Sequence, residues 1–193
     1  DIFFESDEEW SMTSGSYHAK ISIGLLNLYD LTKQKKYLDY IVNLCDFSLK
    51  FQSDDGRYIS FPVRGGTNIH AHCYTAEGLW AVGKFLNRED YLNSSAKGTK
   101  WIFDLQIDDG LIPRLYLNDI PNYNERVDAL AQSVRLAIIH MSEGRLDNSY
   151  SNKVNKTYSL IQKHQANDAD IHINGGLYWG KTSKGEISKD VNS

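Results

Sequence analysis

Two acidic residues, Glu77 and Asp128, carry the chemistry that this sequence most directly suggests. Each lies near the start of an apolar stretch. Breaking a glycosidic bond needs one carboxyl that donates a proton and usually a second carboxylate opposite it. Glu77, Asp128 and the nearby His70 are therefore the candidate catalytic residues. The alternative is an ion pair, which is the commoner use of a buried acid: Asp128 with Arg126 or Arg135, and Glu77 with a neighbouring repeat.

His70 and His72 form a His-x-His pair. A zinc site would need more ligands, and no Cys or carboxylate lies at a standard zinc spacing. We therefore expect no metal and no cofactor. Either histidine could exchange a proton or donate a hydrogen bond to a sugar. His72 has a counterpart in His18, 54 positions earlier, which favours a structural role for that pair and makes His70 the stronger catalytic candidate.

Several cationic and aromatic residues could bind an acidic sugar. A guanidinium matches a carboxylate in a bidentate fork, and an aromatic ring can stack on a sugar face. A uronic acid is therefore the favoured substrate class. The candidate substrate-binding residues are Arg64, His72, Tyr74, Arg114, Arg126, Gln132, Tyr178 and Trp179.

An internal repeat indicates which elements position these residues. Tyr37 lies fifteen residues before Gln52, and Gly56 follows; Tyr91 lies fifteen residues before Gln106, and Gly110 follows. The offset is 54 throughout, and it also relates Gly24 to Gly78 and Leu25 to Leu79. Repeats of this length indicate stacked supersecondary units. The Asp-Asp-Gly segments are interpreted as turns after a helix, with glycine in the left-handed conformation.

Each unit is predicted to be a pair of helices. The first helices span about 15–32, 69–86 and 127–143, and the second span about 35–52, 89–106 and 149–165. The first set is apolar nearly all round, which predicts burial on all sides. The second set carries one apolar stripe and should face solvent on the other side. An inner and an outer ring of helices follow.

The connections alternate in length. The turns within a hairpin are short, whereas the segments 53–68, 107–126 and 166 to the end are long. Antiparallel helices place all the long loops on one face, and long loops usually carry function. The long loops hold Arg64, Arg114, Arg126, Tyr178 and Trp179.

The fold class is therefore all-α, a single domain over 1–193 built from helical hairpins of an (α/α)6-type toroid. About three hairpins are present, and three do not close a ring. We expect an incomplete toroid whose open apolar faces lead to self-association or require a missing C-terminal half.

The composition restricts the partners. The net charge is −4 and no basic stripe occurs, so nucleic acid is not expected. No apolar run is long enough to span a membrane, and no signal-peptide pattern opens the chain. Cys45 and Cys73 are expected to be buried free thiols, which favours a cytoplasmic location. A periplasmic or secreted location remains the alternative if a signal peptide was removed.

Four segments together resemble the six-hairpin α/α-toroid proteins of polysaccharide metabolism. That group includes unsaturated glucuronyl hydrolases, N-acylglucosamine 2-epimerases and toroid proteins of exopolysaccharide biosynthesis. The resemblance covers about residues 15–193 and about half of such a domain. It implies two inner-helix carboxylates, one of them a general acid/base. The segments are His70-Ala-His72-Cys-Tyr74-Thr-Ala-Glu77-Gly78-Leu79, Gln106-x-x-Asp109-Gly110-x-Ile112-Pro113, Arg126-x-Asp128-x-x-Ala131-Gln132 and Gly175-Gly176-Leu177-Tyr178.

Two functions remain open from the sequence. The first is a carbohydrate-active enzyme, hydrolase-like or else a lyase or epimerase, that acts on an acidic oligo- or polysaccharide. The second is a non-catalytic glycan-binding or assembly component of polysaccharide biosynthesis. A terpene-cyclase toroid is disfavoured, because the repeats lack the Gln-Trp signature and acidic cluster of those cyclases.

Overall fold

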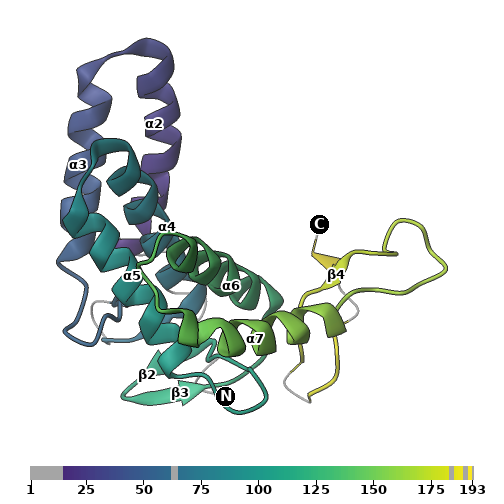
Figure 1. Cartoon of the computed structure of the whole chain (residues 1–193). Helices are drawn as coiled ribbons and strands as arrows, with labels where there is room; N and C mark the ends of the chain where they lie inside the picture. Colours follow the sequence, from purple (N-terminus) through teal and green to yellow (C-terminus); the bar gives the residue numbers. More distant parts are fainter. Residues whose placement is uncertain (1–14, 62–64, 183–184, 189–190, 193) are drawn as a thin grey trace.

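Three helical hairpins follow one another in the computed structural model (Figure 1), which describes residues 15–61, 65–182, 185–188 and 191–192. The inner helices are α2 (Ile21–Thr32), preceded by the 3-10 turn η2 (Ser16–Lys20), α4 (Ile69–Leu86) and α6 (Val127–Ser142). The outer helices are α3 (Lys35–Leu49), α5 (Glu89–Asp104) and α7 (Ser151–Lys163), the last preceded by the 3-10 turn η3 (Asn148–Tyr150).

All six predicted helices are confirmed. The inner helices match within one residue, counting η2 with α2. The outer helices end two or three residues before the predicted ends, because their last residues turn into the loops. The outer helices were therefore predicted correctly as helices, but each was predicted to extend less than one turn too far at its C-terminal end.

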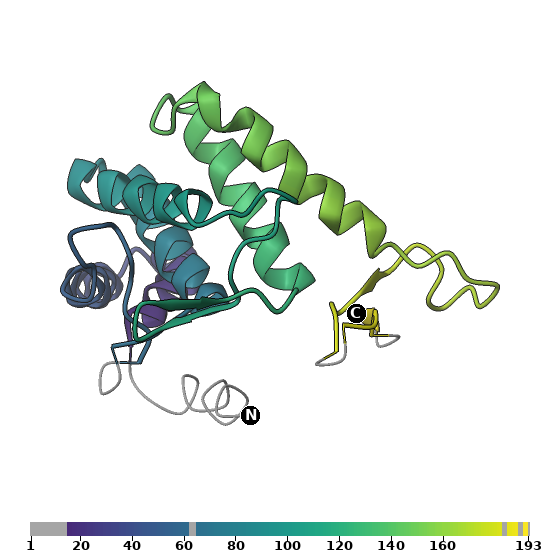
Figure 2. The ribbon, with the colours of Figure 1, turned by 90° about the horizontal axis from the view of Figure 1, so that it is seen from below.

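The hairpins form an arc in which α4 lies between α2 and α6 (Figure 2). α4 buries most of its length: Ile69, Cys73, Ala76 and Leu79 are at most 1% exposed. The outer helix α5 buries one side, with Tyr91 and Ile102 at 0% exposure. The layering of inner and outer helices thus follows the sequence pattern.

The prediction that every inner helix is buried all round is wrong for α2 and, at Ile138 with 53% exposure, for α6. Ile21 is 53% exposed, Leu28 is 43% exposed and Leu31 is 82% exposed. α4 has a hairpin on each side, whereas α2 contacts a neighbouring hairpin among the described residues on one side only. An apolar pattern therefore marks the surface that a neighbour would cover, whether or not that neighbour is present.

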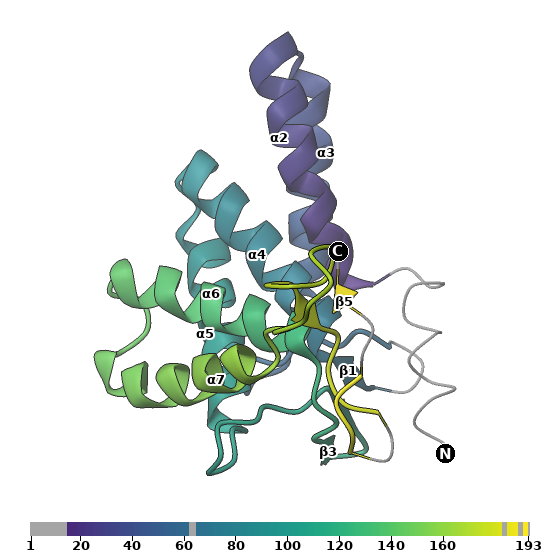
Figure 3. The same ribbon diagram turned by 90° about the vertical axis from the view of Figure 1, so that its right-hand side faces the viewer.

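The long loops come together, as the connectivity predicts. β1 (Thr67–Asn68), from the first long loop, pairs antiparallel with β2 (Leu115–Leu117), from the second, and β2 pairs with β3 (Ile120–Asn122). The third long loop joins this face through a bridge between Arg126 and Gly180, and forms β4 (Leu177–Tyr178), paired with β5 (Val191–Asn192). Figure 3 shows β1, β3 and β5 on the side away from the short turn between α2 and α3.

The repeated glutamine joins each hairpin to the next. Gln52 Nε2 donates to the carbonyls of Gly56, 3.0 Å away, and Ser94 on α5, 2.9 Å away. Gln106 Nε2 lies 2.7 Å from the carbonyl of Lys153 and 2.7 Å from Thr157 Oγ1, both on α7. We call these two contacts the glutamine clasps.

The repeated glycine has a related role. Gly56 has φ 107°, and Gly110 has φ 95°, as predicted for left-handed turn residues. A Cβ at Gly56 would lie 2.6 Å from the carbonyl oxygen of Lys97, on the next outer helix. The repeat signature therefore builds the contact between successive hairpins.

Both cysteines are buried free thiols, as expected. Cys45 Sγ donates to Ser22 Oγ, and Cys73 Sγ lies 3.4 Å from Ser133 Oγ. Within the described ranges, no helix is both long and apolar enough to cross a membrane.

Candidate functional site

Two parallel inner helices present matching stripes of polar side chains at the long-loop end. On each helix the three positions follow i, i+4, i+7 spacing, which places them on one face. The stripe of α4 is His70, Tyr74 and Glu77, and the stripe of α6 is Asp128, Gln132 and Arg135. Contacts join the two stripes at both ends, from His70 to Asp128 and from Glu77 to Arg135.

Asp128 is held by three groups. Its Oδ2 lies 3.0 Å from His70 Nδ1 and 2.9 Å from an Arg126 guanidinium nitrogen, and its Oδ1 accepts from the backbone N–H of Ala129. The carboxyl is 23% exposed. Burial would raise the pKa of Asp128, but the hydrogen bond from His70 and the charge of Arg126 outweigh it and lower the pKa to about 2. Asp128 is therefore ionised at neutral pH.

His70 is positioned by three side chains. Its Nδ1 faces Asp128 and also lies 3.1 Å from Gln132 Nε2, and its ring packs 4.3 Å from the ring of Tyr74. Nδ1 donates to Asp128 when it carries a proton and accepts from Gln132 when it does not, so the two contacts are alternatives and both orient the ring. The pair has the arrangement of an oriented proton-transfer group.

Arg126 connects the carboxylate to an aromatic residue from the third long loop. Its guanidinium carbon lies 3.9 Å from the ring centroid of Trp179, and that of Arg114 lies 5.5 Å from the same centroid. Backbone contacts fix this arrangement, since Val127 N–H donates to the Trp179 carbonyl and Ile69 N–H donates to the Arg114 carbonyl. The second and third long loops thus bring two guanidinium groups to one indole.

Two polar atoms of this cluster are buried without a hydrogen-bond partner among the described residues. They are Arg126 Nε, a donor, and Gln132 Oε1, an acceptor. A buried polar group without a partner is costly and calls for an explanation.

Glu77 occupies the other end of the stripes. It is 8% exposed and pairs with Lys20 and, at 2.5 Å, with Arg135. Burial would raise the pKa of Glu77, but the hydrogen bonds and charges of these two cations lower it overall. Lys20 also lies 5.3 Å from the ring centroid of Tyr74, so Tyr74 lies between the His70 and Glu77 ends of the cluster. The ion pairs considered as the alternative from sequence are both present.

Two of the predicted site residues lie elsewhere, and a third falls outside the described residues. His72 is fully buried, accepts from the backbone N–H of Tyr58 and lies 3.0 Å from the Gly98 carbonyl, so both ring nitrogens serve the packing of the core. Tyr178 is half-buried in β4. Arg64 lies outside the described residues.

Sequence reasoning missed a buried ionic cluster beside the site. Glu125 is 5% exposed and contacts His164 and, at 2.6 Å, Lys181. The lysine and the histidine lower the pKa of Glu125 against the opposing effect of burial. Its backbone carbonyl accepts from Lys181 N–H, so this cluster anchors the third long loop next to Trp179. Glu125 has no counterpart in the repeat, so the sequence carried no signal for it.

Solved structures that share this fold come from several classes of carbohydrate-active enzyme. A polysaccharide lyase matches with a TM-score of 0.69 at 16% identity, over 96% of this chain and 59% of the lyase. A family 88 glycosyl hydrolase from Bacteroides vulgatus matches with a TM-score of 0.67 at 18% identity, over 96% and 60%. A sugar epimerase from a ruminal bacterium matches with a TM-score of 0.73 at 13% identity, over 90% and 47%.

These similarities show the fold, an (α/α)6 toroid represented by part of its hairpins. The chain spans about half the length of the solved structures it matches. No protein-family model and no curated protein sequence matches it. Since one fold supports many reactions, the activity must be argued from the site.

Proposed function

We propose that this toroid acts on an acidic oligo- or polysaccharide, in the manner of a glycoside hydrolase, on the face formed by its long loops. The observation that carries the proposal is the contact of Asp128 with both His70 and Arg126. It joins a group suited to proton transfer to a group suited to binding an anion. The solved structures of the same fold, a lyase, a hydrolase and an epimerase, support carbohydrate as the ligand class.

Recognition of a uronic acid is assigned to Arg126 and Arg114. Both guanidinium groups lie against Trp179, and the Arg126 Nε–H lacks a hydrogen-bond partner within the described chain. A carboxylate accepts bidentate hydrogen bonds from a guanidinium. Because Arg126 already covers the indole at 3.9 Å, we propose that Trp179 orients the arginine and that Tyr74 is the ring that contacts the sugar.

The chemical step is assigned to Asp128 with His70. In hydrolysis, water attacks the anomeric carbon, the bond to the leaving oxygen breaks, the water loses a proton and the leaving oxygen gains one. Since Asp128 is ionised, it suits the role of base toward the water rather than that of the resting acid. Asp128 and His70 contact each other, so both stand on the water side of the bond, and His70 orients the carboxylate. The proton that Asp128 takes from the water is released to solvent after the bond has broken, and the leaving oxygen takes its proton from solvent.

Glu77 is assigned a supporting role. A general acid needs a carboxyl that stays protonated near neutral pH. Lys20 and Arg135 instead stabilise the ionised form of Glu77. We propose that Glu77 fixes these two cations at the edge of the site, where they add positive charge for an anionic ligand.

A variant series tests the catalytic assignment. Asp128→Asn keeps the shape of the side chain and removes its proton transfer, so it should lower the turnover of uronate-containing oligosaccharides roughly a hundredfold or more, with binding largely retained. The matched control is Asp108→Asn, at an exposed loop aspartate on the same face. An Asp128→Asn variant as active as the parent would refute the catalytic role.

A second series tests recognition. Arg126→Ala should weaken the binding of oligouronates more than that of neutral oligosaccharides, measured by calorimetry on matched chain lengths. Equal losses for both ligand classes would contradict an acidic substrate.

The non-catalytic alternative has its own supporting observation, because both carboxylates are held in ion pairs. A parent protein that binds oligouronates and cleaves, eliminates or epimerises none of them would establish a glycan-binding component instead.

A further inference from the structure

The end of the polar stripes farther from His70 and Asp128 carries a second pair of cations. Glu77 Oε1 lies 2.5 Å from Arg135 Nη1, and Glu77 Oε2 contacts Lys20 Nζ. The side chain of Glu77 is 10% exposed, whereas that of Lys20 is 35% exposed and that of Arg135 is 53% exposed. The carboxylate is thus largely covered, and the two cations form the surface. We call Lys20, Glu77 and Arg135 the second cationic end.

Arg135 has room for a further anion. A guanidinium carries several N–H donors in a fork. Arg145, at the short-turn end, directs both terminal nitrogens to Glu89, at 2.9 and 3.0 Å, and its side chain is 21% exposed. Arg135 approaches Glu77 with Nη1, and its greater exposure leaves much of the fork facing solvent. Such a fork can accept a second carboxylate.

The two ends of the stripes have the same charge. The chain as a whole has a net charge of −4, yet each end combines two cations with one carboxylate, which gives each a net charge of +1 when the histidine is left aside. Each end therefore matches one monovalent acidic group. The charged residues are Arg114, Arg126 and Asp128 at the first end and Lys20, Arg135 and Glu77 at the second.

Seven residues separate the two ends along each inner helix. His70 stands level with Asp128, and Glu77 stands level with Arg135, since each pair is in contact. Seven residues of an α-helix rise about 10.5 Å. This distance exceeds the width of one sugar ring, so two acidic groups that reach both ends must belong to different sugar residues.

Tyr74 lies between the two ends, at the middle position of the α4 stripe. Its half-buried ring is 4.3 Å from the ring of His70, and Lys20 Nζ lies 5.3 Å from its centroid. An aromatic ring in this position can contact the apolar face of a sugar. The face therefore presents a cationic group, an aromatic ring and a second cationic group in succession.

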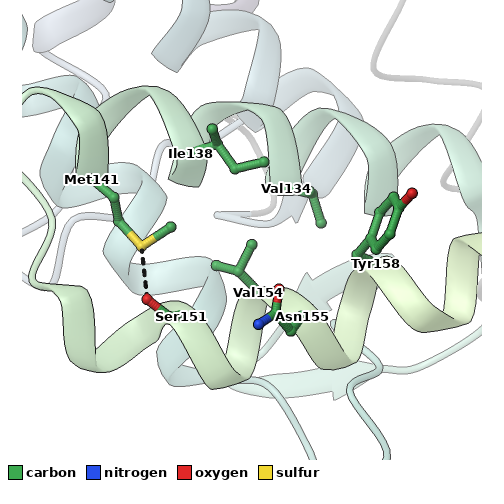
Figure 4. Close-up of a pocket in the computed structure, with 7 residues that line it drawn as sticks. All are labelled: Val134, Ile138, Met141, Ser151, Val154, Asn155 and Tyr158. Carbon is green, nitrogen blue, oxygen red and sulfur yellow. Dashed lines mark hydrogen bonds between the residues drawn. The ribbon is translucent and has the colours of Figure 1, made fainter.

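The apolar groove between α6 and α7 is not a competing site for an anion (Figure 4). It has a volume of about 440 Å³, and its seven lining residues, among them Val134, Ile138 and Tyr158, include no charged side chain. Its α6 residues follow a different stripe of that helix from Gln132 and Arg135. An acidic ligand therefore finds its cationic partners on the polar stripes.

We propose that the ligand of this face carries two carboxylates on different sugar residues, one bound at the Arg126 end and the other by Lys20 and Arg135, with a sugar ring over Tyr74. The inference rests on the proposed function and narrows its substrate class. The substrate is a chain with uronic acids on two or more residues, rather than a neutral chain with a single uronic acid.

Calorimetry with probes of equal length tests the inference. The probes are galactose trisaccharides in which both terminal residues, or only one of them, are galacturonate. The parent should bind the doubly acidic probe about fivefold more tightly, or better, than either singly acidic probe, as expected for a partly exposed ion pair.

Variants then show where the second carboxylate binds. Arg135→Gln and Lys20→Gln should each bring the ratio of the two affinities toward one. The matched control is Arg145→Gln, at an arginine whose terminal nitrogens are already paired with Glu89, and it should leave the ratio unchanged. Circular dichroism checks that each variant is folded.

Nitrogen-15 NMR signals of the arginine side chains give a second measurement, on the parent protein. The Arg135 signal should shift more with the doubly acidic probe than with either singly acidic probe, and the Arg145 signal should stay in place. This measurement does not depend on the folding of any variant.

The outcomes separate this inference from the proposed function. Equal affinities of the parent for doubly and singly acidic probes would overturn the inference and leave recognition of one uronic acid at Arg126 standing. A preference that survives in both Arg135→Gln and Lys20→Gln would also overturn it, because the second carboxylate would then bind elsewhere. A parent that binds none of the probes would refute the proposed function and this inference with it.

Discussion

Asp128 Oδ2 and His70 Nδ1 lie 3.0 Å apart, although the two residues are 58 positions apart in the sequence. Each stands in the first turn of an inner helix, and the two helices run side by side in the same direction. The contact therefore depends on the register between two hairpins. Small shifts in that register would change proton transfer without any change in the residues of the pair.

The charge of Arg126 should set the pKa of Asp128. Burial opposes the ionised carboxylate, while the His70 hydrogen bond and the Arg126 charge hold the pKa at about 2. Arg126→Ala should therefore raise it by roughly a unit or more. The measurement is a carbon-13 NMR titration of the labelled carboxyl group.

A matched variant controls this titration. Arg145→Ala removes a guanidinium that pairs with Glu89 near the short-turn end of the hairpins, and it should leave Asp128 unchanged. Equal pKa values in the parent and in Arg126→Ala would mean that the Arg126 charge does not stabilise the carboxylate.

The protein should lose stability as the pH falls from about 6.5 toward 4. Burial lowers the pKa of both His72 and His140 to about 4 in the folded chain, against an ordinary value of 6.5. Within this window the unfolded chain binds more protons, so acidification favours unfolding. Each histidine contributes at most about 3 kcal/mol.

Denaturant titrations between pH 7 and pH 4.5 measure this effect. The variant His72→Gln removes one of the two groups and should show a shallower dependence on pH, although its stability at pH 7 is lower. Asp128 affects stability in a separate pH range. Its lowered pKa adds stability that is lost only as the pH falls below 3.8, the ordinary pKa of an aspartate. An identical pH dependence in His72→Gln and the parent would contradict the assignment.

Removing a glutamine clasp should loosen the contact between two hairpins. Gln106→Ala deletes the donor to Lys153 and Thr157 on α7, and should cost about 1–3 kcal/mol because buried acceptors lose their partner. Hydrogen exchange should increase in α6 and α7 more than in α2 and α3. The reverse pattern is expected for Gln52→Ala, whose clasp joins the first two hairpins. Uniform exchange in both variants would show that the hairpins unfold as one unit.

The helices were predictable because the same pattern of residues occurs twice at an offset of 54 positions. The positions of Gln52 and Gln106 placed the ends of two outer helices to within three residues, and the apolar stretches located the inner helices. The sheet was not predictable, since its strands have two or three residues and exist only because two loops meet. Short pairings of this kind leave no alternating pattern to detect.

The residues named from the sequence include several that the structure brings together, but the contacts between them were not predictable. Asp128 and His70 were singled out for their types and their places at helix starts. The stacking of Arg126 on Trp179, by contrast, depends on how the third long loop folds back. Glu125, which anchors that loop, lies just before α6 and matches no motif in the sequence. Its partners His164 and Lys181 lie 39 and 56 positions later. Tertiary pairing of this kind has no local signal.

The glutamine clasps also bear on how the chain folds. Each clasp links residues 42 to 51 positions apart, so the contacts that hold one hairpin to the next close only modest loops. Folding can therefore begin at either pair of neighbouring hairpins and extend along the chain. A nascent chain would gain ordered structure as each hairpin leaves the ribosome, before the residues of its last loop have been synthesised.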